Sequence, residues 1–461
     1  MSEGERTTIQ CEIGASSSAR GERFALLAAM VPLVLGPLAI SNVLADIPTA
    51  QKHVVIFSVV SAWIVRVVLT RRGIRIAGVC DAWVAAYALA IGLSVAVSPE
   101  KAFSIRAALF PLVLIGYYFL LTNILVSIPA SRRIIVLMIA VGVVVAGIGV
   151  LQSLGLDLVP YMERHRTPRR TVLSTLGNPN FVASFLGPIC FLVWVPTIEM
   201  GTGKRARIRR IVFGAMAILL LACIIMSGGR GVWIGLFCAT VFIAVVLIVR
   251  GKQILPSRTR RDFVRLGIAV VFLTAVLAGT LFVISNRNPG RGYNLVQHAT
   301  SRREARIRFF YWGVADEMIR DHPWVGFGYG RFSSAFWPQF IEMMKDPQNA
   351  PYREYVRRVY TEQPSKAHNE YIETAVEMGF VGLAAFLGMI LWFVVLSLRI
   401  ALSGDSTPKP RRVQLLLTTG ALLVILVDAM FSFPLHLPAS GLLFWTLMAL
   451  IRNDVTELGS S

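Results

Sequence analysis

Long apolar runs constrain this chain more than any other feature of its sequence. A transmembrane helix needs about 20 mostly apolar residues, and twelve runs of roughly that length divide the chain. They lie near residues 24–44, 54–70, 77–97, 103–127, 133–155, 181–198, 211–227, 231–250, 264–285, 369–398, 413–433 and 439–453. The sequence therefore predicts an all-α, polytopic integral membrane protein with about twelve transmembrane helices.

The composition agrees with a membrane protein and argues against a soluble one. Hydrophobic residues make up 55% of the chain and charged residues 16%, whereas soluble domains average about 45–50% and about 25%. The net charge of +20 suits a nucleic-acid-binding protein, but the apolar runs exclude nucleic acid as the partner. No histidine pair or cysteine cluster has metal-ligand spacing, so we expect no metal and no cofactor.

The distribution of lysine and arginine predicts the orientation in the membrane. With the N-terminus inside, the cytoplasmic loops carry most of these residues, as the positive-inside rule requires. The basic loops lie near residues 71–76, 128–132, 199–210, 251–263 and 399–412. The short outer loops between them hold only Lys52 and Lys101. Both termini are therefore expected in the cytoplasm.

The same spans predict how the chain is organised. We expect the following segments: a cytoplasmic tail (1–23), a nine-span membrane region (24–285), a long external loop between spans nine and ten (286–368), a three-span membrane region (369–453) and a second cytoplasmic tail (454–461). Long loops translocate regardless of their charge. The basic residues of 286–368 are therefore compatible with an outer location, where they favour an anionic partner.

One stretch of the long loop has helical spacing. Between Arg302 and Asp321, an apolar stripe that includes Phe310, Tyr311 and Val314 falls on one face, and charged residues take the other. This pattern predicts an amphipathic helix that lies on the membrane, caps the spans or packs on neighbouring loop segments. The glycine-rich sequence that follows, WVGFGYGRF, predicts a tight turn.

Two short polar constellations fall on the outer side between apolar runs. In Gly177-Asn178-Pro179-Asn180 the residue types favour a turn and a helix N-cap, and capping alone accounts for Asn180. In Ser227-Gly228-Gly229-Arg230-Gly231 an arginine is flanked by glycines. A guanidinium beside exposed backbone donors suits a diphosphate, and an arginine that reaches lipid headgroups is the alternative.

Two further constellations belong to the long loop. Arg308 stands four residues before Trp312, and it is either a ligand of an anion or a solvated residue of the helix surface. His368-Asn369-Glu370 opens the tenth span. Histidine is the side chain best suited to take a proton near neutral pH, although a single histidine at a helix start is often structural. Glu370 and Glu373 lie in the first turns, where the helix dipole favours acids.

Charged residues inside the apolar runs are the remaining candidates. Arg66, Asp81 and Asp428 lie within predicted spans, where ionisable side chains are functional candidates by default. An ion pair inside the bundle explains Arg66 and Asp81 without a functional role. The role of Asp428, which precedes Phe431-Ser432-Phe433, stays open.

In this order, the constellations resemble the bacterial O-antigen ligase and O-antigen polymerase superfamily. The histidine motif of that family is His-Asn, nine residues, Gly, two residues and Gly. Here it reads His368-Asn369, then Gly379, then Gly382. Leu383 departs from the Thr or Val that many ligases have at that position. This departure bears on the subtype more than on the chemistry.

The two arginine motifs also resemble those of the family. The family's first arginine is commonly followed three residues later by Leu, where Trp233 stands here, with Ile234 one residue further. Arg308 with Trp312 is similar to the second family arginine, which precedes a tryptophan in the long loop. The resemblance covers roughly residues 80–440.

The resemblance implies a membrane glycosyltransferase with a GT-C-like helical architecture. Its donor would be a glycan on undecaprenyl diphosphate, and its acceptor a glycan, a lipid A core or a protein, at the outer side of the bacterial plasma membrane. His368, Arg230 and Arg308 would be the catalytic residues of a metal-independent, inverting reaction. Substrate-binding residues would be Asn178, Asn180, Asn369 and Glu370. Membrane lipids would surround the spans.

Two questions stay open at the level of the sequence. A polymerase, a ligase and a protein O-oligosaccharyltransferase all fit the motifs. The segment Phe433-Pro434-Leu435-His436-Leu437-Pro438 resembles one of exopolysaccharide polymerases and protein-glycosylating relatives. The alternative from another class is a twelve-span transporter or a flippase of lipid-linked glycans. Transporters usually carry internal repeats and a midplane site, whereas the polar candidates here gather at the outer rim.

Overall fold

A computed structural model describes the chain in eleven stretches. They are residues 25–40, 50–71, 73–76, 78–124, 128–156, 158–159, 172–198, 203–254, 302–349, 364–402 and 409–459. The expected tail at 1–23, the expected ninth span near 264–285 and residues 286–301 and 350–363 of the expected long external loop lie outside the described residues.

Helices account for the regular secondary structure of the described stretches. The α-helices are α2 (Ala50–Thr70), α3 (Gly78–Val97), α4 (Lys101–Ile124), α5 (Ile128–Ser153), α7 (Pro179–Leu192), α8 (Lys204–Ser227), α9 (Arg230–Ile254), α12 (Arg302–Asp321), α13 (Phe332–Met343), α15 (Glu370–Leu402), α16 (Lys409–Asp428) and α17 (Pro438–Gly459). Short 3₁₀ turns cover Val195–Thr197, Pro347–Asn349 and Pro434–His436. This all-helical architecture agrees with the expectation from the apolar runs.

Nine helices of the described stretches are long and apolar enough to cross a membrane. They correspond to nine of the expected spans, from Gln51–Thr70 to Pro410–Asp428. The expected first span is described as a shorter apolar helix, Ala25–Leu38. The boundary expected at residue 433 differs, because α16 ends at Asp428 and a 3₁₀ turn follows at Pro434–His436. Proline has no backbone N–H and disfavours helical backbone in the residue before it, so a helix could not have continued through Phe433 and Pro434.

Helix α16 lies in the middle of the bundle and contacts α7, α9, α15 and α17. Glycines permit the close approach of α7 and α9 to it, as in other membrane bundles. A Cβ atom at Gly235 of α9 would lie 2.8 Å from the carbonyl oxygen of Val424, and one at Gly187 of α7 would lie 2.9 Å from the Val424 side chain. This packing brings the ends of α7, α9 and α16 together.

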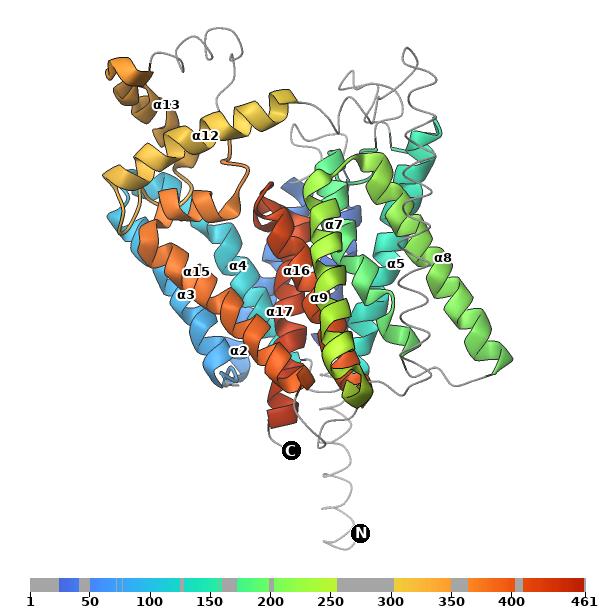
Figure 1. The fold of residues 1–461 in the computed structure, drawn as a ribbon. Coiled ribbons are helices and arrows are strands. Elements are labelled where there is room, and N and C mark those ends of the chain that lie inside the picture. The colour runs from blue at the N-terminus through green and yellow to red at the C-terminus, as the bar shows by residue number, and fades with distance from the viewer. Residues whose placement is uncertain are drawn as a thin grey trace, which may run out of the picture.

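Helices α12 and α13 form a layer across one end of the bundle, which we call the α12 end (Figure 1). The apolar stripe of α12 is buried, with Phe310, Val314 and Met318 at most 3% exposed, and it packs against α13 and the start of α15. The amphipathic helix expected at 302–321 therefore caps the bundle. Both the end of α17 and the start of α8 lie at the opposite end (Figure 1).

Helix α15 is broken at Gly379, where φ is 62° and the backbone leaves the helix. The glycine-rich segment 323–330 fits into this break. The Phe380 N–H donates to the Pro323 carbonyl (2.7 Å), and the Phe327 N–H donates to the Val376 carbonyl (2.9 Å). A side chain at Gly379 would collide with the backbone of Trp324. The motif glycine therefore permits backbone-to-backbone contact that docks the loop onto the span.

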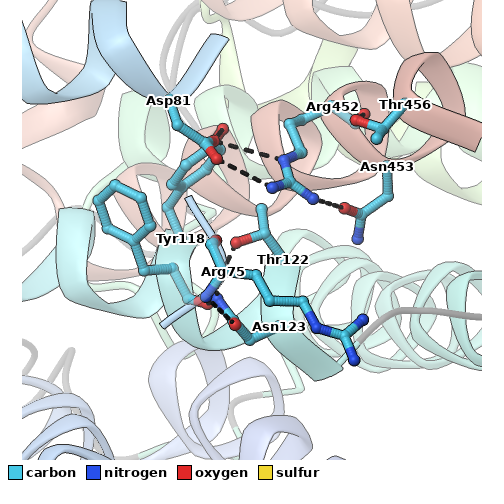
Figure 2. Close-up of polar contacts among 9 residues, drawn as sticks. Arg75, Asp81, Tyr118, Thr122, Asn123, Arg452, Asn453 and Thr456 are labelled. Atoms are coloured by element: carbon cyan, nitrogen blue, oxygen red, sulfur yellow. Dashed lines mark hydrogen bonds and ion pairs between the residues drawn. The ribbon is translucent and has the colours of Figure 1, made fainter. Parts of the chain in front are cut away.

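A buried ion pair ties α3 to α17 (Figure 2). Arg452 Nη2 lies 2.9 Å from Asp81 Oδ2, and the Tyr118 hydroxyl donates to Asp81 Oδ1 at 2.7 Å. Asp81 is fully buried and Arg452 is 6% exposed. The structure thus contains the ion pair that was expected for Asp81. Arg66 is half-buried, and no ion pair links it to the residues that the structure describes.

Candidate active site

A pocket of about 590 Å³ opens at the α12 end. Its wall contains side chains from five segments that are far apart in the sequence. Five sequence-predicted residues line it: Asn178, Asn180, Arg230, Arg308 and His368. The structure thus brings together all three residues expected to be catalytic and two of the four expected to bind substrate.

The Gly177–Asn180 turn starts α7 at the rim of the pocket. Asn178 has extended backbone angles, and its side chain accepts a hydrogen bond from the Asn180 N–H at 2.9 Å. Pro179 then occupies the first helical position, for which its fixed φ is suited. The N-cap is therefore Asn178, and the expectation that capping accounts for Asn180 is wrong. Both side chains reach the pocket wall.

The turn between α8 and α9 places Arg230 at the pocket. Helix α8 ends at Gly228, which has a left-handed conformation (φ 73°), and α9 begins at Arg230. A side chain at Gly229 would collide with Ala183 of α7, and one at Gly231 would crowd Asp428 of α16. The glycines therefore let the turn pack against both helices. Arg230 is half-buried and is the first residue of α9, where backbone N–H groups favour anions.

The spacing of Arg308 and Trp312 has a structural reason. The two residues are one turn apart on α12. Arg308 lines the pocket, and the Trp312 indole Nε1–H donates to the Ala367 carbonyl at 3.0 Å. Because Ala367 immediately precedes His368, a single helix face supplies a cation to the pocket and holds the histidine loop beside it.

His368 has a left-handed backbone, with φ at 54°, which is uncommon for a residue other than glycine. Its ring stacks on Tyr311, with centroids 6.3 Å apart, and meets Phe433 edge-on at 5.2 Å. Asn369 does not line the pocket. Its side chain accepts hydrogen bonds from the N–H groups of Tyr371 (3.0 Å) and Ile372 (3.1 Å) and so caps α15.

Glu370 points into a neighbouring cavity and not into the pocket that His368 lines. It is 2% exposed. One oxygen accepts a hydrogen bond from the Leu435 N–H at 2.8 Å, and the other lies 3.0 Å from His436 Nδ1. The substrate-binding role expected for Glu370 therefore has no geometric support in this pocket.

Asp428 is the pocket residue whose role the sequence left open. It ends α16 and is 4% exposed. Its carboxylate accepts a hydrogen bond from the Ser184 hydroxyl at 2.5 Å, and it interacts electrostatically with Arg308. Ser432 and Phe433 complete this side of the wall. In the sequence, these two residues could have been found because they closely follow Asp428, a carboxylate within a predicted span.

The comparison with known families agrees with the motifs. Residues 215–387 match the family model described as O-antigen ligase. The matched segment begins within α8 and ends within α15, so it includes Arg230, Arg308 and His368. A search of curated proteins finds no match.

Proposed function

We propose that this chain, whose residues 215–387 match the O-antigen ligase family, belongs to the O-antigen ligase and O-antigen polymerase superfamily and transfers a glycan from undecaprenyl diphosphate to an acceptor hydroxyl. One observation carries the proposal. Arg230, Arg308 and His368 come from three distant segments and meet in one pocket. Two guanidinium groups and one imidazole are the chemistry that a diphosphate leaving group and an acceptor hydroxyl require.

In this proposal the two arginines bind the diphosphate. Guanidinium groups form paired, charge-assisted hydrogen bonds to phosphate oxygens. A partly buried site strengthens these bonds as negative charge develops on the leaving group. Two cations fulfil that need, so the proposed reaction uses neither a metal nor a cofactor. Asp428 lines the same pocket, where its carboxylate attracts the Arg308 guanidinium.

His368 is the proposed general base. Its imidazole takes the proton of the acceptor hydroxyl while the hydroxyl oxygen bonds to the anomeric carbon of the donor. The bond from that carbon to the phosphate oxygen breaks, and its electron pair leaves on undecaprenyl diphosphate. Direct displacement inverts the anomeric configuration. Asn178 and Asn180 bind sugar hydroxyls, and Asn369 acts on His368 by capping the adjacent helix.

We propose that the pocket faces the outer side of the bacterial plasma membrane and that both termini are cytoplasmic. The support comes from charge. Helix α8 begins with the basic run Lys204-Arg205-Ala206-Arg207 at the end of the bundle opposite to α12 (Figure 1). Basic loops stay in the cytoplasm. The α12 end, and with it the pocket, is then on the outer side, where the lipid-linked glycan is presented.

A transfer assay tests the proposed function. Purified protein in detergent receives lipid-linked glycan from a strain that lacks this protein, together with an acceptor glycan. We expect free undecaprenyl diphosphate in the products by mass spectrometry, and the same amount after treatment with a chelator. Movement of the lipid across vesicles without its release would overturn the transferase in favour of a transporter. Loss of activity with the chelator would contradict the metal-independent mechanism.

The products in the deletion strain distinguish the subtypes. A strain that lacks a polymerase accumulates single repeat units on the carrier lipid. A strain that lacks a ligase accumulates full-length chains on the carrier, and a strain that lacks a protein O-oligosaccharyltransferase loses glycan from protein.

Replacing Arg230 with lysine tests whether this arginine binds the diphosphate through paired hydrogen bonds. Lysine keeps the positive charge but lacks the planar fork that binds two phosphate oxygens at once. We expect a clear loss of kcat, of about tenfold or more, since a charge-assisted hydrogen bond contributes about 1.5–3 kcal/mol. Arg320→Lys, on the exposed surface of α12, is the matched control. Wild-type turnover in Arg230→Lys would mean that the residue acts only as a point charge.

A further inference from the structure

Five charged or titratable side chains form a buried cluster behind His368, which we call the carboxylate cluster. They are Lys366, Glu370, Glu373, Glu377 and His436. The three glutamates lie on one side of the first turns of α15 and, together with His436, border a small cavity. This cavity is separate from the pocket that contains His368. The mechanism above gives the cluster no role.

Glu373 makes the contacts nearest to His368. It is 1% exposed, and its Oε1 atom lies 2.6 Å from Lys366 Nζ. Its Oε2 atom accepts a hydrogen bond from the Ala367 N–H at 2.9 Å. One carboxylate therefore holds both residues that precede His368.

The peptide unit before His368 is fixed from the other side as well. The Trp312 indole donates to the Ala367 carbonyl at 3.0 Å. His368 itself has φ at 54°, a conformation that persists only where the surroundings impose it. Glu373 and Trp312 are the groups that hold Ala367 next to this residue, one at its N–H and one at its carbonyl.

We propose that Glu373 is a positioning residue for the reaction: it fixes the loop at 366–368 so that the His368 imidazole faces the pocket. This inference rests on the proposed function, because it concerns the orientation of the proposed base. Glu373 touches no substrate and acts through the backbone of Ala367. Its ion pair with Lys366 keeps the carboxylate in place.

The charges of the cluster are consistent with this role. Burial lowers the pKa of Lys366, but Glu373 and Glu377 outweigh it, so that the pKa lies above its ordinary value. Burial and Lys366 likewise lower the pKa of His436, and the facing carboxylates of Glu370 and Glu373 raise it to a net value above the ordinary one. Lys366 is thereby kept in the charged form that pairs with Glu373, and the facing carboxylates favour the charged form of His436.

The same cluster also contacts the segment that carries Phe433, another residue of the pocket wall. His436 lies between Glu370 and Glu373, at 3.0 Å and 3.5 Å from their oxygens. Glu370 accepts the Leu435 N–H, two residues after Phe433, whose ring touches His368. The base and the aromatic side chain beside it are therefore positioned by one connected set of charges.

Glu373→Gln tests the proposal. The amide keeps the size of the side chain but cannot form the ion pair with Lys366. We expect kcat for undecaprenyl diphosphate release to fall by about 10–100-fold, the effect of a misplaced catalytic group. The KM for the donor should change little, since the pocket arginines and asparagines stay in place. Glu373→Asp, which keeps the charge, should recover part of the lost kcat. Glu342→Gln, an exposed carboxylate on α13, is the matched control.

Hydrogen exchange gives a readout that does not depend on turnover. The amides of 364–369 should exchange faster in Glu373→Gln than in the wild type, because the Ala367 N–H loses its charged acceptor. Unchanged kcat and unchanged exchange in a folded Glu373→Gln protein would overturn the positioning role while the transferase stands. If the wild type shows no transfer, the proposed function fails and the exchange result alone decides whether Glu373 holds the loop.

A folding defect in Glu373→Gln is covered by a second variant. Trp312→Phe removes the hydrogen bond to the Ala367 carbonyl and leaves the carboxylate cluster intact. We expect the same loss of kcat at nearly constant KM and the same faster exchange at 364–369. Wild-type behaviour of Trp312→Phe in both measurements would contradict the proposal.

Discussion

Removing the imidazole of His368 is expected to lower the rate of glycan transfer by about 10²–10⁴-fold, the contribution of a well-positioned general base. His368→Asn is the better substitution, since asparagine tolerates left-handed backbone and φ at this position is 54°. His368→Ala should show the same loss together with some backbone strain. Single-turnover release of undecaprenyl diphosphate by purified protein measures the effect.

His322 supplies the matched control for this prediction. It is exposed at the end of α12, and its ring touches Phe327 rather than the pocket. His322→Asn should transfer glycan at the wild-type rate. Full activity in His368→Asn would exclude the histidine as base and would direct attention to Asp428, the buried carboxylate of the same pocket.

Much of the candidate site could be predicted from sequence because its residues belong to local motifs. Asn178, Arg230, Arg308 and His368 each stand in a short pattern whose chemistry is readable without a structure, and they meet in one pocket. Their contacts could not be predicted in this way. The hydrogen bond from Trp312 to Ala367 joins residues 55 positions apart, and no periodicity in the sequence indicates it.

Glu370 shows that closeness in the sequence can also suggest the wrong role for a residue. Its position two residues after His368 suggested a substrate-binding role, but the first turn of α15 points it toward Leu435 and His436. Adjacent helical residues face different directions, so proximity in sequence does not decide which cavity a side chain reaches.

The helical fold was predictable from hydropathy, and the ends of helices were less so. Apolar composition identifies a span whether or not its last residues are helical. Residues 429–437 remain largely apolar, yet α16 ends at Asp428. Hydropathy could not predict the break in α15 at Gly379 either, because the flanking residues are apolar and a glycine inside a span is common.

Replacing Asp81 with asparagine is expected to lower the free energy of unfolding by about 3–5 kcal/mol, the cost of leaving one member of a buried ion pair without its partner. Arg452 is 6% exposed and its guanidinium lies 2.9 Å from Asp81 (Figure 2). In Asp81→Asn this charge stays buried, and the hydrogen bond from Tyr118 weakens. Unfolding in a denaturing detergent, followed by circular dichroism, measures the loss.

Two comparisons separate the ion pair from other effects of that substitution. Asp316→Asn removes a carboxylate from the exposed i,i+4 pair with Arg320, and such pairs contribute only about 0.3–0.5 kcal/mol. The double variant Asp81→Asn with Arg452→Gln should be more stable than Asp81→Asn alone, because no buried charge remains. A double variant as unstable as the sum of the single ones would show that the two side chains do not interact.

The backbone hydrogen bonds between the segment 323–330 and the broken helix α15 also have a consequence for biosynthesis. The ribosome makes α12 and the segment 323–330 before it makes α15, yet the N–H groups of Phe327 and Gly328 pair with carbonyls of Val376 and Glu377. The segment that carries Arg308 can therefore dock only after α15 has entered the membrane. A nascent chain that stops short of α15 contains both arginines but cannot bring them to a histidine, so the pocket comes into being late in synthesis.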